Sequence, residues 1–363
     1  MKNENQMNRR AFARVVSMTT AGLALGGGGM VIAACGNDHS AKEVVYPEVS
    51  LEPDDPMPVS FSDVLLLPAG EPDFVSSYGE APQQFGELWQ PGTEGPLPLV
   101  VLIHGGCWQG AYDIEHIRPA ATALREAGYL VWAIEYRRIG EHGGGWPGTF
   151  DDVGLAIDHL DEVLKQRGLT TRSRVFMGHS AGGQLALWAA ARPGLADNHR
   201  FHSPNAVAPD AVVGLAAITD MKTYAEGESS CEKSTVQLLG ALVEQPDRYA
   251  AVSPIHLLPM RVPSILAQGA DDPIVPPAQS ETFHSRAREM GEKSSILRLT
   301  GAGHFDLIHP RTGAWRAILS TLRECLGVWM GTSVWRWSEV IRWPKCGPAS
   351  CYLKIRFTSM GIR

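Results

Sequence analysis

Two apolar runs around a glycine-rich turn constrain the fold of this chain more than any other feature. Residues 175–177 suit a buried strand, and residues 184–188 suit a buried helix. Between them, Gly178-His179-Ser180-Ala181-Gly182 fits the pattern G-x-S-x-G. The turn needs small residues two positions before and after the serine, because a Cβ there would collide with the crossing strand and helix. The stretch predicts a nucleophilic Ser180 at the top of a sheet, with a small-residue turn of no catalytic use as the alternative.

The other apolar segments predict an α/β fold. Residues 99–103 form a continuous apolar run, which is typical of a central parallel strand covered on both faces. Strand and helix patterns alternate around it, which favours a mostly parallel central sheet with helices on both faces. A less regular region through about Tyr249 is expected to form a small cap. Strands are expected at residues 63–67, 84–89, 99–103, 130–135, 211–215, 262–268 and 294–299, and helices at residues 117–127, 151–166, 184–191, 278–290 and 314–326.

The first 34 residues predict a targeting segment that is not part of the fold. Residues 8–14, which include Arg9-Arg10, resemble the twin-arginine export signal, and the stretch after them is only mildly apolar. Ile32-Ala33-Ala34-Cys35 resembles the lipobox of bacterial lipoproteins, which predicts lipidation at Cys35. An ordinary signal peptide with a chance cysteine is the alternative. Residues 35–58 are polar and proline-rich, which favours a flexible tether.

Charge divides the chain into three parts. The net charge of the whole is −7, with +3 in residues 1–34 and +5 in residues 328–363, so residues 35–327 hold −15. An acidic body argues against nucleic acid as a partner. Residues 328–363 also hold four of the ten tryptophans. We interpret them as an atypical C-terminal extension of a folded domain at 59–327, with a membrane-touching tail as the alternative.

The cysteines and histidines show no metal-binding pattern. Six cysteines are present, so lipidation at Cys35 would leave five and at least one unpaired thiol. Export would permit disulfides, but the spacing does not indicate a disulfide framework. Neither a C-x-x-C nor an H-E-x-x-H motif occurs. No metal and no cofactor are therefore expected.

A base and an acid must follow the serine if Ser180 is a nucleophile. The hydroxyl needs a base to take its proton and a third group to orient that base. In enzymes with this turn, the acid and then the histidine come later in the chain. His304 follows the last expected strand on a glycine-rich loop and is the candidate base. The acid is expected after the preceding strand, where the residue pattern alone does not separate Asp271 from Asp272.

The negative charge that develops on an attacked carbonyl needs fixed N–H donors. One candidate is the amide of Ala181, directly after the nucleophile. The second is expected from the loop after residues 99–103, where glycines allow close approach of the backbone. The amides of Gly106 and Cys107 are the candidates there, and we interpret His104 as structural.

Six motifs occur in one order along the chain. They are His104-Gly105-Gly106-Cys107-Trp108, Glu135-Tyr136-Arg137-Arg138, Gly145-Trp146-Pro147, the Ser180 turn, Gly269-Ala270-Asp271-Asp272-Pro273-Ile274-Val275-Pro276 and Gly301-Ala302-Gly303-His304-Phe305. From about Ser60 to Leu326 the chain thus resembles the α/β-hydrolase superfamily. The resemblance is closest to its esterase and lipase branch, with feruloyl and acetyl-xylan esterases, hormone-sensitive-lipase-like enzymes and kynurenine formamidases.

The resemblance implies an α/β-hydrolase fold and refines the candidate site. The family pattern G-x-x-D-x-x-V-P selects Asp272 over Asp271. Cys107 replaces the third glycine of the HGGG form, which favours the HGGxW form of kynurenine formamidases. Trp108 and Trp146 are the candidate substrate-pocket side chains. The family's usual histidine before the acid-bearing glycine is Gln268 here, which leaves the triad intact.

The sequence therefore predicts an exported, lipid-anchored serine hydrolase that cleaves a small-molecule carboxylic ester. Its membrane contact would be the lipid anchor. An arylformamidase or a serine peptidase with the same triad is the alternative within enzymes. A non-catalytic surface lipoprotein is the alternative from another class, although the presence of all three triad residues disfavours it. The acyl and alcohol parts of the substrate and the oligomeric state are not specified.

Overall fold

The computed structural model describes residues 49–50 and 58–326. In these ranges the strands are β1 (Val49–Ser50), β2 (Phe74–Ser77), β3 (Phe85–Trp89), β4 (Leu97–Ile103), β5 (Leu130–Ile134), β6 (Thr171–His179), β7 (Ala211–Leu215), β8 (Ser264–Gly269) and β9 (Ser294–Thr300). The helices are α1 (Phe61–Leu65), α2 (Arg118–Glu126), α3 (Gly148–Arg167), α4 (Ala181–Ala191), α5 (Met221–Tyr224), α6 (Ser230–Leu239), α7 (Pro246–Val252), α8 (Ala278–Glu289) and α9 (Gly313–Leu326). Short 3-10 turns are η1 (Ile114–Ile117), η2 (Arg192–Gly194), η3 (Pro254–Leu257) and η4 (Phe305–Ile308).

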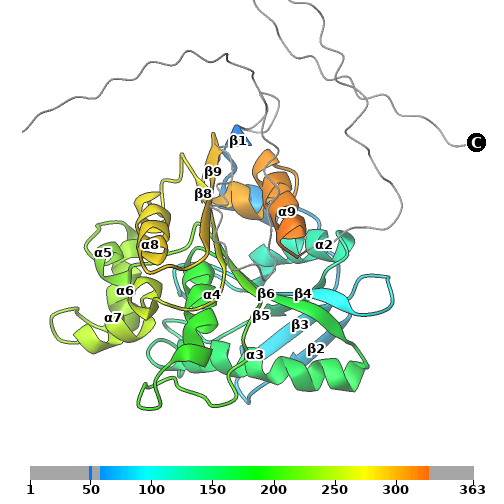
Figure 1. Cartoon of the computed structure of the whole chain (residues 1–363), viewed down its shortest axis with the longest axis horizontal. Helices are drawn as coiled ribbons and strands as arrows, with labels where there is room; N and C mark the ends of the chain where they lie inside the picture. Colours follow the sequence, from blue (N-terminus) through cyan, green and yellow to red (C-terminus); the bar gives the residue numbers. More distant parts are fainter. Residues whose placement is uncertain (1–48, 51–57, 327–363) are drawn as a thin grey trace, which may run out of the picture.

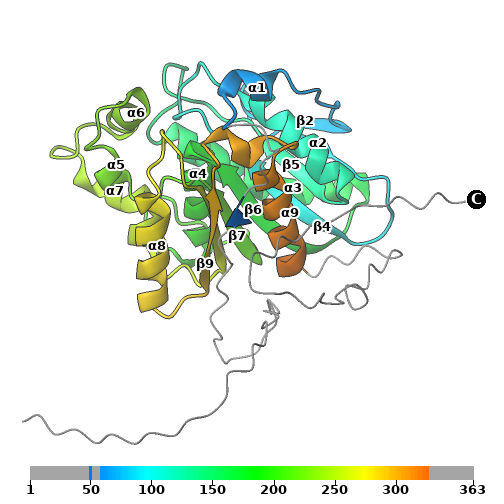
Figure 2. The same ribbon diagram turned by 90° about the horizontal axis from the view of Figure 1, so that it is seen from above.

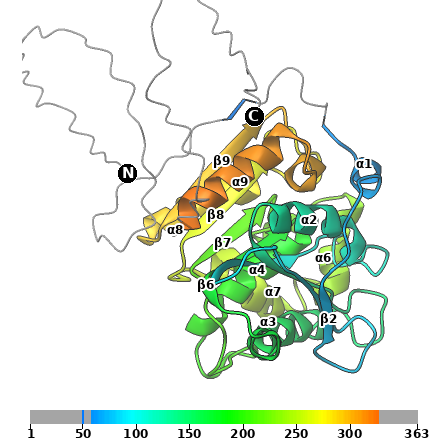
Figure 3. The same cartoon turned by 90° about the vertical axis from the view of Figure 1, so that its right-hand side faces the viewer.

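The described strands form one sheet in the order β1-β9-β8-β7-β6-β4-β5-β3-β2. β3 runs antiparallel to both β2 and β5, and the other pairings are parallel. Helices cover both faces: α2 and α9 lie on one side, and α3, α4 and α8 lie on the other (Figures 1 and 3). The predicted α/β-hydrolase fold, with a mostly parallel sheet between two helical layers, is confirmed.

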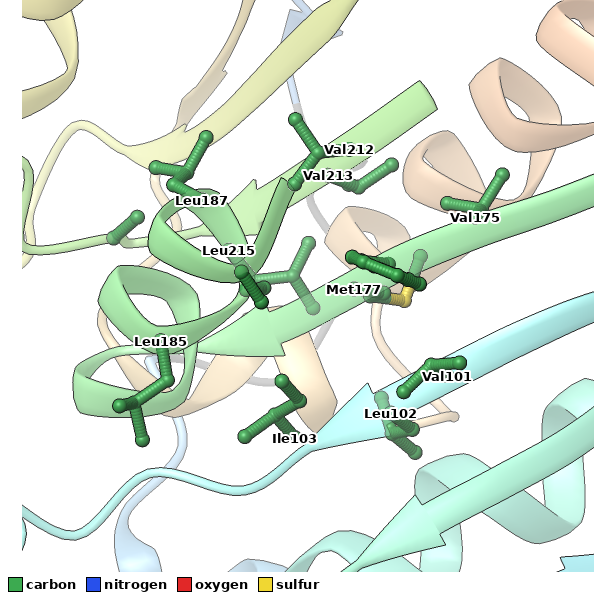
Figure 4. Close-up of a cluster of buried hydrophobic side chains, with 14 of the residues drawn as sticks. Val101, Leu102, Ile103, Val175, Met177, Leu185, Leu187, Val212, Val213 and Leu215 are labelled. Carbon is green, nitrogen blue, oxygen red and sulfur yellow. The ribbon is translucent and has the colours of Figure 1, made fainter. Parts of the chain in front are cut away.

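The centre of the sheet is apolar because both of its faces are covered. Every residue of β4 and β7 is buried, and so is the C-terminal half of β6. Valine, leucine, isoleucine and methionine side chains from these strands form one buried cluster with Leu185 and Leu187 of α4 (Figure 4). α4 is buried on every side, which explains why it carries no polar stripe. The Ser180 turn is therefore built on the fully buried centre of the sheet.

The predicted strand at residues 63–67 is wrong, because that stretch holds most of α1. Ser60 begins the helix: its Oγ accepts a hydrogen bond from Asp63 N, and the Asp63 carboxylate accepts one from Ser60 N at 2.7 Å. This reciprocal cap satisfies N–H groups that an extended chain would leave open. Two short edge strands, β1 and β2, were not predicted. β1 lies within the predicted tether at 35–58 and pairs with β9.

The region between β7 and β8, expected to be less regular, holds three helices. α5, α6 and α7 gather beside α8 at one end of the molecule (Figure 2). The targeting segment at 1–34, Cys35 and the extension at 328–363 lie outside the described residues. Across residues 58–326, no helix combines the length and the apolarity needed to cross a membrane.

A buried carboxylate fixes α3 to the chain just before β3 and just after β5. Asp152 has no exposed side-chain surface, and it accepts hydrogen bonds from Arg137 N, Nε and Nη2 at 2.7–2.9 Å and from Gln84 Nε2 at 2.7 Å. Its neighbour Asp151 is 36% exposed and pairs with Arg200, which is 53% exposed. Two adjacent aspartates of one helix thus have opposite surroundings.

We expect Asp152→Asn to lower the free energy of unfolding by about 3 kcal/mol, because the amide leaves part of the buried Arg137 network unpaired. Asp151→Asn is the matched control, and we expect a loss below about 1 kcal/mol because exposed ion pairs contribute little. Urea denaturation of both variants measures the difference. Equal losses would show that the buried carboxylate does not secure α3.

Candidate active site

Ser180 lies at a sharp turn between β6 and α4. Its backbone has φ 57° and ψ −121°, a conformation that costs an L-residue free energy and needs support from its surroundings. The strand and helix cross so closely that a Cβ at Gly178 would lie 2.0 Å from Gly182 O. A Cβ at Gly182 would lie 2.2 Å from Ile103 O. The small residues that the sequence pattern requires are thus explained by backbone contacts on both sides of the serine.

The Ser180 hydroxyl is not used by the helix that it begins. Ser180 is the N-cap residue of α4, yet its side chain makes no capping hydrogen bond. Its backbone N–H donates to Leu215 O at 2.8 Å, which fixes the turn to the end of β7. The serine is 2% exposed. The hydroxyl therefore stands at the start of a helix whose N-terminal N–H groups favour negative charge.

Asp272 and His304 are brought together by the loops after β8 and β9. His304 Nδ1 lies 2.7 Å from Asp272 Oδ2, and both side chains are buried. The other carboxylate oxygen, Asp272 Oδ1, accepts the backbone N–H groups of Ile274 at 2.8 Å and Val275 at 2.9 Å. Asp271 is exposed, and its carboxylate has no hydrogen bond to His304 among the described contacts. The geometry thus pairs His304 with Asp272 rather than Asp271.

The described contacts include no hydrogen bond between Ser180 Oγ and the His304 ring. His179, next to the serine, instead joins the Ser180 turn to the loop that carries His304. Its Nε2 lies 3.0 Å from His304 O, and the centroids of the two imidazole rings are 4.4 Å apart. Since a carbonyl oxygen only accepts, Nε2 is the protonated nitrogen of His179. Burial, and then the neighbouring His304, hold the pKa of His179 well below its usual value, so this ring stays neutral.

The loop after β4 runs directly against the serine turn. A Cβ at Gly105 would lie 2.7 Å from His179 O and 3.1 Å from Ser180 Cβ, so only a glycine allows this approach. Among the described residues, the backbone N–H groups of Gly106, Cys107 and Ala181 donate to no protein acceptor. Two of them lie on this loop and the third follows the serine. The arrangement suits the binding of a developing negative charge between the loop and α4.

A buried polar network supports the start of this loop. His104 Nε2 lies 2.9 Å from Glu135 Oε1, and the His104 ring stacks on Tyr136 at 4.4 Å. Tyr136 Oη donates to His104 O at 2.9 Å. Burial alone would raise the pKa of Glu135, but the attraction of His104 and Arg138 holds that pKa below its usual value. His104 is therefore a structural residue, as the sequence analysis expected.

The structure corrects the prediction that Trp108 lines a substrate pocket. Its side chain has no exposed surface, and its Nε1 donates to Gln184 Oε1 of α4 at 3.1 Å. Trp108 fixes the loop to α4 and does not present its ring to a substrate. Trp146 is half-buried, and its described ring contacts are with Phe150, Phe201 and Arg248. The contacts of Trp146 thus join α3 to the region after α4.

One element of the site was missed by the sequence analysis. Cys107 forms a disulfide with Cys231 in the first turn of α6, across 124 positions of the chain. No spacing rule connects two cysteines so far apart, and only the folded chain brings their Cα atoms to 5.2 Å. In residues 58–326, no group of three or more histidine, cysteine, aspartate or glutamate side chains is arranged to hold a metal ion.

Comparison with known proteins places the chain in a family. A family model described as BD-FAE matches residues 88–287, more than half of the chain. The chain belongs to the BD-FAE family. The stretch that matches the BD-FAE model contains Ser180 and Asp272, and it ends before His304. The predicted resemblance to the esterase branch of the α/β-hydrolases is confirmed.

Curated relatives of this BD-FAE member include several esterases. Esterase LipQ of Mycobacterium tuberculosis is 28% identical over 258 residues, which cover 68% of this chain and 59% of LipQ. Kynurenine formamidase of Drosophila melanogaster is 24% identical over 237 residues, which cover 64% of this chain and 74% of that protein. The chain spans little more than half the length of the first curated relatives that it matches, LipQ and the probable carboxylic ester hydrolase LipM.

Solved structures share the BD-FAE member's fold. Esterase B of Lactobacillus rhamnosis has a TM-score of 0.62 and 19% identity, and the match covers 72% of this chain and 89% of that chain. A truncated carbohydrate esterase from gut microbiota has a TM-score of 0.61 and 18% identity, with 75% of this chain and 100% of that chain covered.

The buried histidines near the site predict how stability depends on pH. His116 packs edge-on against His104, and its Nδ1 is buried without a hydrogen-bond partner among the described groups. Burial, and then the neighbouring His104, lower the pKa of His116 to about 3. From about pH 6.5 downward, the unfolded chain binds a proton at this position and the folded chain does not. Folding stability is therefore lost as the pH falls from 6.5 toward 3.

We expect His116→Gln to reduce the slope of the free energy of unfolding against pH by about 1.4 kcal/mol per pH unit between pH 4 and pH 6. The unfolded variant then binds about one proton fewer than the unfolded wild type. His142→Gln, at an exposed histidine, is the control and should keep the wild-type slope. Free energies of unfolding measured in urea at several pH values give the slopes. An unchanged slope in His116→Gln would contradict the assignment of a neutral, buried His116.

Proposed function

We propose that this protein is a serine hydrolase that cleaves carboxylic esters through an acyl-enzyme. The observation that carries the proposal is the 2.7 Å contact between His304 Nδ1 and Asp272 Oδ2, on loops that meet the Ser180 turn. With Nδ1 donating to the carboxylate, His304 Nε2 is the nitrogen that is free to take the serine proton. The curated relatives named esterase and carboxylic ester hydrolase support an ester as the substrate class.

The reaction proceeds in two halves. Ser180 Oγ attacks the ester carbonyl as His304 Nε2 takes its proton, and the amides of Ala181 and of Gly106 or Cys107 bind the oxyanion. In comparable sites, each such donor lowers the activation free energy by roughly 3–4 kcal/mol. His304 then gives the proton to the departing alcohol. Water, deprotonated by His304, attacks the acyl-enzyme, and the acid leaves as Ser180 regains its proton. We expect Ser180 Oγ and His304 Nε2, which share no hydrogen bond among the described contacts, to form one when substrate binds.

We expect Ser180→Ala, His304→Ala and Asp272→Asn each to lower kcat by about 10³-fold or more, because the three groups act as one unit. Combining two of these substitutions should add little to the loss of one. The exposed neighbour Asp271→Asn is the matched control and should keep nearly all activity. Steady-state hydrolysis of nitrophenyl esters measures these effects. Near wild-type hydrolysis by Ser180→Ala would contradict the assignment.

Arylformamide hydrolysis is the second candidate activity. The loop His104-Gly105-Gly106-Cys107-Trp108 has the HGGxW form, and a kynurenine formamidase is among the relatives. Both reactions use the same nucleophile and oxyanion donors, so the substrate decides between them. Specificity constants for nitrophenyl esters, formyl-kynurenine and short peptides, measured on one preparation, separate an esterase from an arylformamidase and a peptidase.

We further propose that the protein is exported and held at the bacterial cell envelope by a lipid on Cys35. The residues that support this proposal are Arg9-Arg10 and the lipobox-like Ile32-Ala33-Ala34-Cys35, which occur in the order that export and lipidation require. A thioether-linked diacylglycerol supplies two acyl chains, and two chains anchor a protein stably where one does not.

We expect Cys35→Ser to move the protein from the membrane fraction to the soluble fraction, or to leave its leader uncleaved. Cys346→Ser, at a cysteine outside the lipobox-like motif, is the control and should stay with the membranes. Fractionation with immunoblotting and mass spectrometry of the N-terminus measure both outcomes. Wild-type protein found at full length in the soluble cytoplasmic fraction would contradict the proposal.

A further inference from the structure

The loop that carries two of the oxyanion candidates has an unfavourable backbone. Gly106, Cys107 and Trp108 follow one another with φ values of 99°, 52° and 57°. Glycine adopts this left-handed region freely, but for other residues it costs of order 1–3 kcal/mol and persists only where surrounding contacts hold it. Contacts with the rest of the molecule must therefore hold Cys107 and Trp108.

The Trp108 end of the loop is held by α4 and by Ile139. The indole donates to Gln184 of α4, and Trp108 O accepts the backbone N–H of Ile139 at 2.8 Å. These contacts fix the residue after Cys107. They do not reach the Cys107 side chain, which is only partly buried.

The Cys107 side is held by α6. Cys107 is bonded to Cys231, and Gln109 Nε2 donates to Ser234 Oγ at 2.9 Å and to Gln237 Oε1 at 2.6 Å. Residues 231, 234 and 237 recur every three positions and so lie along one side of the helix. One side of α6 thus holds the oxyanion loop by a covalent bond and by two hydrogen bonds from a second residue.

α6 is itself firmly attached, so it can act as a support. A capping box of Ser229 and Glu232 begins the helix, and the side chains of Leu238 and Leu239 are buried. Trp146 N donates to Leu238 O at 3.2 Å, close to the helix end. The C-terminal end of the helix is therefore fixed to the rest of the molecule independently of the disulfide, and a local cap secures its first turn.

We propose that the Cys107–Cys231 disulfide, with Gln109, holds the amides of Gly106 and Cys107 in the geometry that binds the oxyanion. This inference rests on the proposed ester hydrolysis. Such donors stabilise a transition state because they are fixed before charge develops, so a loop that relaxes out of the left-handed region loses that advantage. Cys231 and Gln109 are positioning residues that act through the loop and do not touch the substrate.

With this role for the disulfide, kcat depends on whether Cys107 and Cys231 are joined or reduced to thiols. A dithiol reductant delivers two electrons and two protons to the disulfide, which gives two thiols, while the dithiol itself becomes a cyclic disulfide. Reduction leaves Ser180, His304 and Asp272 in place and removes the covalent support of the loop. It should therefore lower transition-state stabilisation more than the affinity for the ground-state substrate.

The first test uses Cys231→Ser, the double variant Cys107→Ser/Cys231→Ser and Gln109→Ala. Val236→Ala, an exposed position of the same helix, is the matched control. We expect kcat on a nitrophenyl ester to fall about 10- to 100-fold in the cysteine variants, with a smaller loss in Gln109→Ala and none in Val236→Ala. The affinity for a trifluoromethyl ketone, whose adduct with serine carries an oxyanion, should fall by the same factor, while KM changes less than about threefold.

The second test reduces folded protein, which avoids any variant that fails to fold. Dithiothreitol should bring the wild type down to the rate of the double variant and leave the double variant unchanged. Alkylation with mass spectrometry confirms that Cys107 and Cys231 have become thiols. The unchanged double variant excludes effects through Cys325 and the other cysteines.

The outcomes separate this inference from the proposed function. A wild type with no hydrolytic activity on any ester would overturn both. An active wild type whose reduced form and cysteine variants keep their kcat and their affinity for the ketone, even with a lower melting temperature, would overturn the inference alone. That result would make the disulfide a purely structural bond.

Discussion

The backbone of Ser180 is the constraint on which the rest of this structure depends. A residue with φ 57° and ψ −121° between a strand and a helix is tolerated only where its neighbours leave no alternative. The burial of β6 and α4 in the centre of the molecule provides that restraint, and it explains why the surrounding positions are glycine. A Cβ at Gly183 would lie 2.7 Å from the Ala217 Cβ, so even the helix face is restricted to small residues. The catalytic candidate can thus keep its strained backbone because buried elements on both sides hold it.

Around this rigid turn, the site is assembled from loops that are each fixed by buried polar contacts. Glu135 and His104 hold the loop after β4, and His179 Nε2 donates to the carbonyl of His304. Asp306 adds a further tie, since its Oδ2 accepts Gly303 N at 3.0 Å and Val59 N at 3.1 Å. Buried hydrogen bonds in a low-dielectric interior favour one arrangement, because breaking one would leave a further buried polar group unpaired. The packed sheet positions the serine, and buried hydrogen bonds position its partners.

The sequence was most informative where a feature depends on neighbouring residues. The alternation of strands and helices, and the position of Ser180 at a strand end, follow from patterns a few residues long. The same short range explains the failure at residues 63–67, where apolar residues suggested a strand. The cap formed by Ser60 and Asp63 outweighed that preference. Local patterns compete with one another, and a capped helix of five residues is too short for its periodicity to be recognised.

What the sequence by itself determined was the fold class, the serine turn and the order in which acid and histidine follow it. These depend on residue size, hydrophobic period and chain direction, which are local properties. Only the tertiary structure decided which distant groups meet. It turned Trp108 into the core against Gln184 and joined Cys107 to Cys231 across 124 positions. The physical reason is that the entropic cost of closing a loop grows only with the logarithm of its length. Residues far apart in the chain can therefore meet almost as readily as near ones, and no sequence spacing marks the pairs that do.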